Sequence, residues 1–291
     1  ACRDVDIRFN EVCGMLDSNS GYDATGIDID WGNSERIRVW YNHAHDNFGN
    51  GIVTMACRDS EIVANRVEGN HCIYNCGAGQ IALTNYHVDD RPDAIKNVEG
   101  LEIRDNLILV DRPNTCALNT LKSSEGPAWT KNRFVGNRIV LKPGIDPAGL
   151  YQIRPEAAID TVAGNTVYGY RAEDHPAAAQ DAFAPAITAA PPACERLTAT
   201  LTDAGHVALS WTLAAAAGAA GPGDAAVHYN IHRSKVAGFT PAFTNMIGRT
   251  TQCAFVDEAA ELSPGTTFYA VRAEDACGGY GLVAEADVDI R

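Results

Sequence analysis

The sequence has no apolar run that approaches the length of a membrane-spanning helix, so it predicts no membrane span. It is also poor in cations, with 23 Lys and Arg against 37 Asp and Glu and a formal net charge of −14. Because nucleic-acid affinity depends on clustered cations, this balance argues against a nucleic-acid partner. An anionic substrate would need a local basic groove or a bridging metal ion. With 291 residues, 46% of them hydrophobic, the chain can still bury a core, and we expect two domains.

The nine cysteines are an odd number, so at least one thiol is unpaired within the chain. Cys2 and Cys57 hold the same place in a repeated phrase, two strand spacings or about 10 Å apart, which is too far for a disulfide. We therefore expect both to be small residues that face the core. No second ligand pair at zinc spacing follows His71, Cys72 and Cys76, which favours structural packing for them.

One phrase, apolar-x-x-Asn-x-apolar, recurs along the first 170 residues. Its asparagines are Asn10, Asn42, Asn65, Asn106, Asn137 and Asn165. A second repeat supports this pattern, since the sequence ACRD at positions 1–4 recurs at positions 56–59. The apolar residues alternate with period two, which excludes heptad and helical-pair arrays and indicates short strands.

The phrase predicts a parallel β-helix, in which each strand lies on its counterpart in the next coil at roughly 4.8 Å. The apolar residues beside each Asn then point inward, and the Asn side chain at the bend bonds to neighbouring coils. Alignment of the strand starts gives an inward row of Ile27, Ile52, Ile81, Ala117 and Leu150. An outward row follows, made of Asp28, Val53, Ala82, Leu118 and Tyr151. A second outward row holds Asp30, Met55, Thr84, Thr120 and Ile153.

On these residues, positions 1–170 resemble the right-handed parallel β-helix proteins, a group that includes pectate lyases, polygalacturonases and other polysaccharide-cleaving enzymes. The resemblance is specific for architecture and weaker for activity, because the repeat that carries it is structural. It implies a secreted or cell-surface protein that acts on a polysaccharide. A β-helix needs a cap over its first coil, and residue 1 falls inside a repeated phrase. We therefore expect the chain to be the C-terminal part of a longer precursor or a processed fragment, so that further coils, and with them catalytic residues, can lie in the missing N-terminal part.

After Tyr170 the alternation stops. Residues 171–193 are rich in Ala and Pro and predict a linker, with a short helix possible over Ala177–Ala182. Residues 194–291 change to short strands separated by turns, which predicts a β-sandwich. The expected strands are Leu197–Leu201, His206–Trp211, Val227–Arg233, Ala254–Val256, Thr267–Arg272 and Leu282–Asp289.

The segment 194–291 resembles a fibronectin type III domain of the bacterial secreted kind. Trp211, the strand around Tyr229 and the stretch Leu262–Tyr269 carry this resemblance, and Tyr269 fits the position of the tyrosine corner. The chain is thus expected to be all-β, with a right-handed parallel β-helix followed by a fibronectin-like sandwich. The resemblance implies that the second domain is a spacer, or an accessory that contacts carbohydrate or a surface.

The best candidate for a catalytic cluster combines outward carboxylates with histidines of the next loop. Its members are Asp28, Asp30, His43, His45 and Asp46, with Arg58 one coil further on. Paired carboxylates can act as acid and base on a glycosidic bond, or they can hold Ca²⁺ that bridges to a uronate. In the second case Asp28 and Asp30 are the metal ligands, and Arg58 or a histidine neutralises or deprotonates the substrate. Turn formation explains Asp46 equally well, and solvation explains an outward Asp.

Substrate binding is the expected role of Trp31, Tyr86 and His87. The two aromatic rings can stack on sugars, although either can equally cover the core. If the chemistry lies in this chain, Asp28 and Asp30 should lie within about 10 Å of Asp46 or a neighbouring histidine.

Two functions from different classes fit the pattern. The first is a secreted polysaccharide lyase or glycoside hydrolase. The second is a non-catalytic surface or adhesion protein that uses the β-helix as a rigid rod. The apolar outward positions Val53, Met55, Ala82 and Leu118 favour the rod, because a sugar-binding groove is normally more polar. Polar loops that converge around Asp28 would favour the enzyme, and a flat apolar sheet face would favour the rod.

Overall fold

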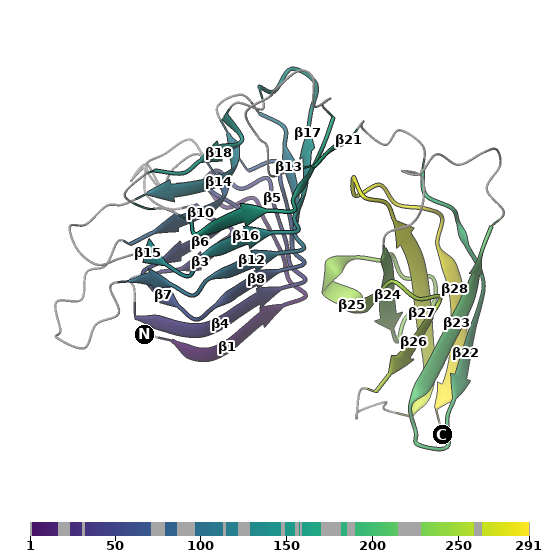
Figure 1. Ribbon diagram of the computed structural model, residues 1–291. Coiled ribbons are helices and arrows are strands. Elements are labelled where there is room, and N and C mark those ends of the chain that lie inside the picture. The colour runs from purple at the N-terminus through teal and green to yellow at the C-terminus, as the bar shows by residue number, and fades with distance from the viewer. Residues whose placement is uncertain are drawn as a thin grey trace. The chain divides into compact units, whose positions relative to one another are not determined.

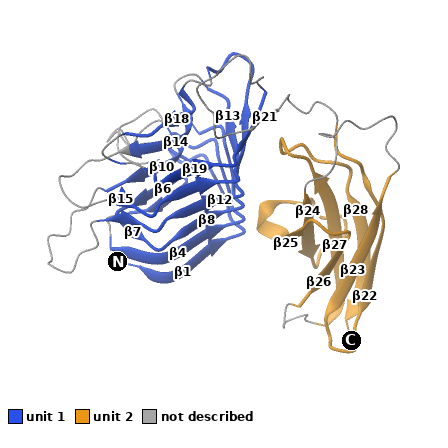
Figure 2. Cartoon of the chain, viewed as in Figure 1, with its two compact units in different colours: residues 1–186 blue, residues 187–291 orange. Residues whose placement is uncertain are grey.

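The computed structural model describes residues 2–16, 24–30, 33–70, 79–85, 97–112, 115–121, 129–146, 149–154, 157, 159–169, 182–184, 190–214, 228–258 and 264–290. The chain divides into two compact units, residues 1–186 and 187–291 (Figure 2). Among these described residues the regular structure is β-strand apart from short 3-10 turns such as η4 (Phe243–Asn245). Within the same ranges, no helix has the length and apolar character needed to cross a membrane.

The first unit contains three parallel sheets through which the chain passes in turn (Figure 1). The nine-stranded sheet contains β1 (Arg3–Arg8), β4 (Ser34–Trp40), β7 (Cys57–Arg58), β8 (Glu61–Val63), β11 (Val98–Glu99), β12 (Glu102–Arg104), β15 (Trp129–Thr130), β16 (Arg133–Val135) and β19 (Thr161–Ala163). The seven-stranded sheet contains β2 (Glu11–Cys13), β5 (His43–His45), β9 (Arg66–Glu68), β13 (Leu107–Val110), β17 (Arg138–Leu141), β20 (Thr166–Tyr168) and β21 (Ala182–Ala184). The five-stranded sheet contains β3 (Ile27–Ile29), β6 (Ile52–Met55), β10 (Gly79–Thr84), β14 (Cys116–Leu121) and β18 (Tyr151–Gln152). Each passage through the sheets, which we call a coil, pairs with the next, an arrangement compatible with a parallel β-helix.

The six phrase asparagines stack on one another at the corner between the nine- and seven-stranded sheets, which confirms their predicted place. Each side-chain Nδ2 from Asn10 to Asn137 donates to Oδ1 of the next Asn at 2.9–3.0 Å. The same Oδ1 accepts the backbone N–H of the preceding Asn. A further bond runs back to the backbone, as when Asn65 Nδ2 donates to the Val39 carbonyl at 2.8 Å. Asn65 is 1% exposed, so the stack supplies partners that water cannot.

The residue before each of these asparagines has a left-handed backbone. The φ angles are 56° at Phe9, 54° at Tyr41, 54° at Ala64, 57° at Asp105, 64° at Gly136 and 66° at Gly164. This repeated conformation turns the chain from one sheet into the next and aims the Asn side chain along the stack. The corner therefore has one geometry that is used six times.

A second, shorter amide stack follows the seven-stranded sheet. Asn47 Nδ2 donates to Asn70 Oδ1 at 2.9 Å, and Asn70 Nδ2 donates to Gln80 Oε1 at 2.7 Å. Gly51 packs so closely against this stack that a Cβ at its position would collide with Val67 and Asn70. The coils are thus bonded side chain to side chain at two corners.

The apolar residues beside the asparagines form the core of the first unit, but one predicted row is wrong. Ile27, Ile52 and Ile81 stack as expected. Ile81 then pairs with Leu118, and Leu118 with Tyr151, so the predicted members Ala117 and Leu150 are each one residue early. The same slip places Asn119 beside Ala82, and Leu121, in place of Thr120, beside Thr84. Long connections of unequal length precede β14 and β18, and an error of one residue there exchanges the two faces.

The predictions for the two cysteines have different outcomes. Cys57 is buried, as expected, whereas Cys2 is exposed. Burial raises the pKa of the Cys57 thiol to about 11, which suits a packed and unreactive group. His71, Cys72 and Cys76 lie outside the described residues.

The second unit consists of two antiparallel sheets that share one apolar core. One sheet contains β22 (Cys194–Leu201), β23 (Val207–Leu213) and β26 (Ala254–Asp257), and the other contains β24 (His228–Ser234), β25 (Met246–Thr250), β27 (Gly265–Glu274) and β28 (Ala284–Ile290). The core includes Trp211, Tyr229 and Tyr269. Sequence patterning did not predict β25, because Gly248 interrupts it. A Cβ at this position would lie 2.5 Å from the Phe255 ring of the facing sheet, so the ring would have to shift to admit a larger residue.

Tyr269 makes a different bond from the one that the family resemblance implies. A tyrosine corner bonds to backbone, whereas the Tyr269 hydroxyl donates to Asp257 Oδ2 at 2.8 Å. Arg233 Nη1 donates to the same oxygen at 2.7 Å. The buried carboxylate of Asp257 on β26 thus connects this strand to β24 and β27.

The predicted linker 171–193 contains a strand. β21 pairs in parallel with β20, and its first residue, Ala182, was expected to end a helix. The rest of that expected helix lies outside the described ranges. The boundary between the two compact units, at 186/187, falls within this stretch. The domain bounds 1–170 and 194–291 stay predictions.

We predict that Asn65→Ala lowers the free energy of unfolding by about 1–3 kcal/mol, because it leaves buried partners such as the Val39 carbonyl unpaired. Asn10→Ala is the matched control, since Asn10 is exposed at the end of the described stack. It should cost much less. Urea unfolding followed by circular dichroism measures both, and equal losses would contradict a stabilising role for the interior of the stack.

We predict that the second unit loses stability as the pH falls from 6.5 to 4. His232 is fully buried, and burial lowers its pKa to about 4 from the 6.5 of a solvated imidazole. The unfolded chain therefore binds a proton in this window and the folded chain does not, which costs up to about 3 kcal/mol at the acid end. Thermal unfolding of the chain with His232→Gln should show a flatter pH dependence, and an unchanged slope would refute the assignment.

Candidate functional site

The repeat places polar side chains in rows on the outer face of the seven-stranded sheet. Positions one and three after each phrase asparagine point outward, while the position between them enters the core. Strands β2, β5 and β9 pair in register, so one row consists of Glu11, His43 and Arg66 and the other of Cys13, His45 and Glu68. We call Glu11, His43, His45, Asp46, Arg66 and Glu68 the histidine cluster. It joins three successive coils.

The two imidazoles of the cluster stack on each other and share one carboxylate. Their ring centroids are 4.1 Å apart, with 26° between the ring planes. His45 Nε2 lies 3.3 Å from Glu11 Oε1, and His43 Nδ1 lies 3.8 Å from the same oxygen. One nitrogen of each ring therefore converges on Glu11.

The other ring nitrogens contact two further carboxylates. His43 Nε2 lies 2.7 Å from Glu68 Oε1, and His45 Nδ1 lies 2.8 Å from Asp46 Oδ2. Arg66 holds Glu68 from the other side, with Nε 2.7 Å from Oε1 and Nη2 3.0 Å from Oε2. Both imidazoles are thus oriented from two directions.

The surroundings set the charge states of the inner pair. Burial raises the pKa of Glu68, but hydrogen bonds from His43 and Arg66 outweigh it and bring the pKa down to about 2. Burial lowers the pKa of His43 below its usual 6.5, and the Glu68 contact only partly offsets this. At neutral pH the pair therefore consists of a carboxylate and a neutral imidazole.

Three aromatic rings lie at the corner that leads into the cluster. Phe9 and Tyr41 stack at 5.5 Å with 8° between their planes, and Trp40 lies 5.2 Å from Tyr41. All three are half-buried. The Arg8 and Arg38 guanidinium carbons lie 5.2 and 5.6 Å from the Trp40 ring. We call Phe9, Trp40 and Tyr41 the aromatic patch.

Two residues of the aromatic patch occupy a strained position. Phe9 and Tyr41 have the left-handed backbone that Gly136 and Gly164 adopt at the same corner of later coils. A bulky side chain in this region costs about 1–2 kcal/mol, whereas glycine adopts it freely. Ala64 and Asp105 adopt the same backbone at this corner, so the fold imposes the conformation and the two aromatic residues bear its cost. Strain of this kind is frequent at functional sites, which makes the aromatic patch a candidate binding surface.

The predicted catalytic set is divided among three sheets. His43, His45 and Asp46 come together at β5, as described above. Asp28 lies on β3 and Asp30 directly after it, in the five-stranded sheet. Arg58 lies on β7 in the nine-stranded sheet, where its Nη2 is 3.0 Å from Glu35 Oε2. The expected 10 Å span from Asp28 and Asp30 to Asp46 stays a prediction.

The predicted substrate-binding residues Trp31, Tyr86 and His87 lie outside the described residues. Sequence reasoning missed several site residues that the structure brings to the histidines and the corner: Glu11, Arg66, Glu68, Phe9, Trp40 and Tyr41. A signal for them was present, because counting from each phrase asparagine aligns the same positions of successive coils.

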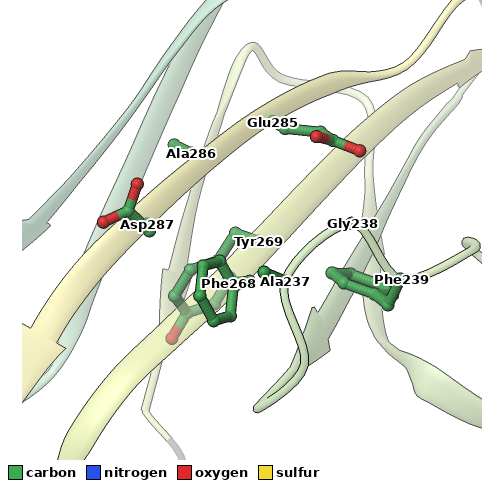
Figure 3. A pocket seen from close by; sticks show the side chains of 8 residues that line it. All are labelled: Ala237, Gly238, Phe239, Phe268, Tyr269, Glu285, Ala286 and Asp287. Atoms are coloured by element: carbon green, nitrogen blue, oxygen red, sulfur yellow. The ribbon is translucent and has the colours of Figure 1, made fainter.

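A shallow pocket in the second unit offers a weaker candidate. It has a volume of about 250 Å³ and lies between β27, β28 and the turn at residues 237–239 (Figure 3). Phe239 and Phe268 contribute rings, and Glu285 and Asp287 contribute carboxylates. Sites for small organic ligands usually enclose about 300–1,000 Å³, so this pocket carries no functional argument.

We found no match for the chain among protein-family models or among curated protein sequences. The fold and the cluster define the class as an all-β chain with stacked parallel sheets and an outward group of histidines and carboxylates. Any narrower statement depends on the chemistry of the site.

Proposed function

We propose that the chain is a secreted or cell-surface carbohydrate-active protein, which binds a polysaccharide at the aromatic patch and cleaves its glycosidic bonds at the histidine cluster. The observation that carries the proposal is the aromatic patch, in which the stacked Phe9 and Tyr41 both have a left-handed backbone conformation. We further propose that the parallel sheets form a right-handed β-helix. In this proposal the second unit is a fibronectin-like β-sandwich that acts as a spacer or accessory.

Aromatic rings suit a sugar ligand because the C–H face of a pyranose packs against them, while its hydroxyls bond to neighbouring polar groups. Arg8 lies against the Trp40 ring and can supply such a group, whereas the Arg38 guanidinium over the same ring is already paired with Asp6. Guanidinium groups also match the carboxylate of an acidic sugar. The aromatic patch thus combines apolar and cationic contacts in a chain whose net charge is −14.

The aromatic patch and the histidine cluster belong to the same coils. Phe9 precedes β2 and Tyr41 precedes β5, and in the sequence Asn42 is the single residue between Tyr41 and His43. A polysaccharide that crosses the corner would leave the aromatic patch and meet the imidazoles. Imidazole nitrogens are the usual groups for proton transfer at a reacting carbon or oxygen.

Elimination is the reaction class that the cluster geometry favours. Acid-assisted hydrolysis uses two carboxyl groups that face each other across the bond. Both oxygens of Glu68 are instead engaged, Oε1 by His43 and Arg66 and Oε2 by Arg66. Glu68 therefore orients His43, and Glu11 and Asp46 each contact His45. Because all three carboxylates of the cluster face imidazoles, a lyase with an imidazole as its base fits better than a hydrolase with a carboxyl pair.

The alternative of a non-catalytic rod is less well supported. It depended on exposed apolar side chains, but Val53 and Ala82 are 0% and 1% exposed, and with Met55 they form a separate buried cluster. Leu118, the fourth residue of that argument, lies in the core. A Ca²⁺ site at Asp28 and Asp30 stays a separate proposal in the five-stranded sheet.

Tyr41→Gly tests the proposal most sharply. Glycine adopts the backbone of this corner without strain, so we expect the free energy of unfolding to change by less than about 1 kcal/mol. Affinity for the polysaccharide should fall about tenfold or more, as loss of a stacking ring implies. Tyr168→Ala, at a half-buried ring on β20, is the matched control and should bind normally.

The assay is a panel of polysaccharides, with binding measured by affinity electrophoresis and cleavage by both unsaturated products and new reducing ends. Unsaturated products indicate elimination, and reducing ends without unsaturation indicate hydrolysis. Binding by Tyr41→Gly equal to that of the unaltered chain would refute the role of the aromatic patch. Absence of binding across acidic and neutral polysaccharides would refute the function.

A further inference from the structure

We infer that the histidine cluster is a binding site for a divalent transition-metal ion such as Zn²⁺, with Glu11, His43 and His45 as its protein ligands. The inference rests on the geometry of the cluster, and it holds whether or not the cluster cleaves a glycosidic bond. An ion there would occupy ring nitrogens that could otherwise accept a proton. Metal binding and polysaccharide binding can therefore be tested separately.

Three ligand atoms already converge on one point. One ring nitrogen of His43, one of His45 and a Glu11 carboxylate oxygen all lie within 4.8 Å of one another, and the nitrogens nearest to Glu11 are His43 Nδ1 and His45 Nε2. Their separations from Glu11 Oε1 are 3.8 and 3.3 Å. Ligands at about 2.0–2.2 Å from a tetrahedral Zn²⁺ lie about 3.4 Å apart, so small side-chain movements suffice to enclose an ion.

The partners of the far nitrogens match those of metal-bound histidines. A metal-ligating imidazole usually donates its second N–H to a carboxylate, which fixes the tautomer and the ring orientation. His43 has Glu68 in this position at 2.7 Å, and His45 has Asp46 at 2.8 Å. Each ring is thus held by a carboxylate on its far nitrogen, and in both the nitrogen that would bind the ion is the one directed at Glu11.

The backbone positions these ligands in advance. His43 and His45 are separated by one inward residue on β5, so both side chains leave the same face, and Glu11 lies opposite His43 in register. The neighbouring charges favour a cation. Glu11, Asp46 and Glu68 carry three formal negative charges and Arg66 one formal positive charge, so the acidic side chains outnumber the basic one.

The ligand set selects a transition metal over Ca²⁺ or Mg²⁺. Two imidazoles and one carboxylate suit Zn²⁺ and its neighbours, whereas Ca²⁺ and Mg²⁺ are bound through oxygen. Cys13 is exposed and lies opposite His45 in register, two residues after Glu11. Either its thiolate or a solvent molecule completes a tetrahedral site. Three protein ligands with one further position open is the arrangement of catalytic zinc sites.

Isothermal titration of the reduced 291-residue chain with ZnCl₂ tests the inference. We expect one ion per chain at the site, with affinity lowered at least 100-fold by His45→Ala and by Glu11→Gln. Glu68→Gln, which changes the partner of the far nitrogen of His43 and removes no ligand, should weaken binding about 10- to 100-fold. His206→Ala removes a histidine of the second unit and is the matched control, with no expected change. CaCl₂ at the same concentration should not compete.

Circular dichroism and thermal unfolding verify that the variants fold. If His45→Ala does not fold, Glu11→Gln provides a second test, because Glu11 is exposed. Titration with CoCl₂ distinguishes the ligands, because a thiolate-to-cobalt band that disappears in Cys13→Ser would identify the thiol as the fourth ligand. Zinc affinity unchanged in both His45→Ala and Glu11→Gln overturns the site, as does the absence of zinc binding. Tyr41→Gly should retain zinc while it loses polysaccharide, so failure of one proposal is distinguishable from failure of the other.

Discussion

The first unit depends on one repeated interaction, the hydrogen bond between the side-chain amides of successive asparagines at the corner between two parallel sheets. Each buried Asn side chain bonds to the coil before it and to the coil after it, and none of these groups can turn to water instead. A slip of one residue would break the stack and move the apolar rows out of the core. The stack therefore fixes the register of the flanking strands as well as their stability.

That register determines what the outer face presents. Because the position after each asparagine always points outward, Glu11 and His43 lie side by side although 32 positions separate them. The corner residue just before the asparagine is equally fixed, which places Phe9 beside Tyr41. The aromatic patch and the histidine cluster thus result from the same constraint. The later coils have no aromatic residue at this corner, where Ala64, Asp105, Gly136 and Gly164 take the same backbone conformation.

The sequence predicts the features that local pattern encodes, namely the corner asparagines, the alternation of strands and the change of pattern near residue 194. It fails where long connections separate the copies, so Leu118 was assigned to the wrong face. The second amide stack of Asn47, Asn70 and Gln80 was missed because its members differ in residue type. Of the predicted site residues, His43, His45 and Asp46 lie together at β5, whereas Asp28 lies on β3 in another sheet. Their catalytic roles and the expected span between them stay predictions.

The central claim is that the asparagine stack holds the coils in register, and native-state hydrogen exchange at single-residue resolution tests it most directly. The backbone N–H groups of Asn42, Asn65 and Asn106 each donate to a side-chain oxygen of the next asparagine at 2.9–3.0 Å. If the stack is permanent, these amides exchange only through global unfolding of the first unit, as slowly as the N–H of Ile103 in the core. Fast exchange of the three asparagine amides while Ile103 stays protected would contradict the account.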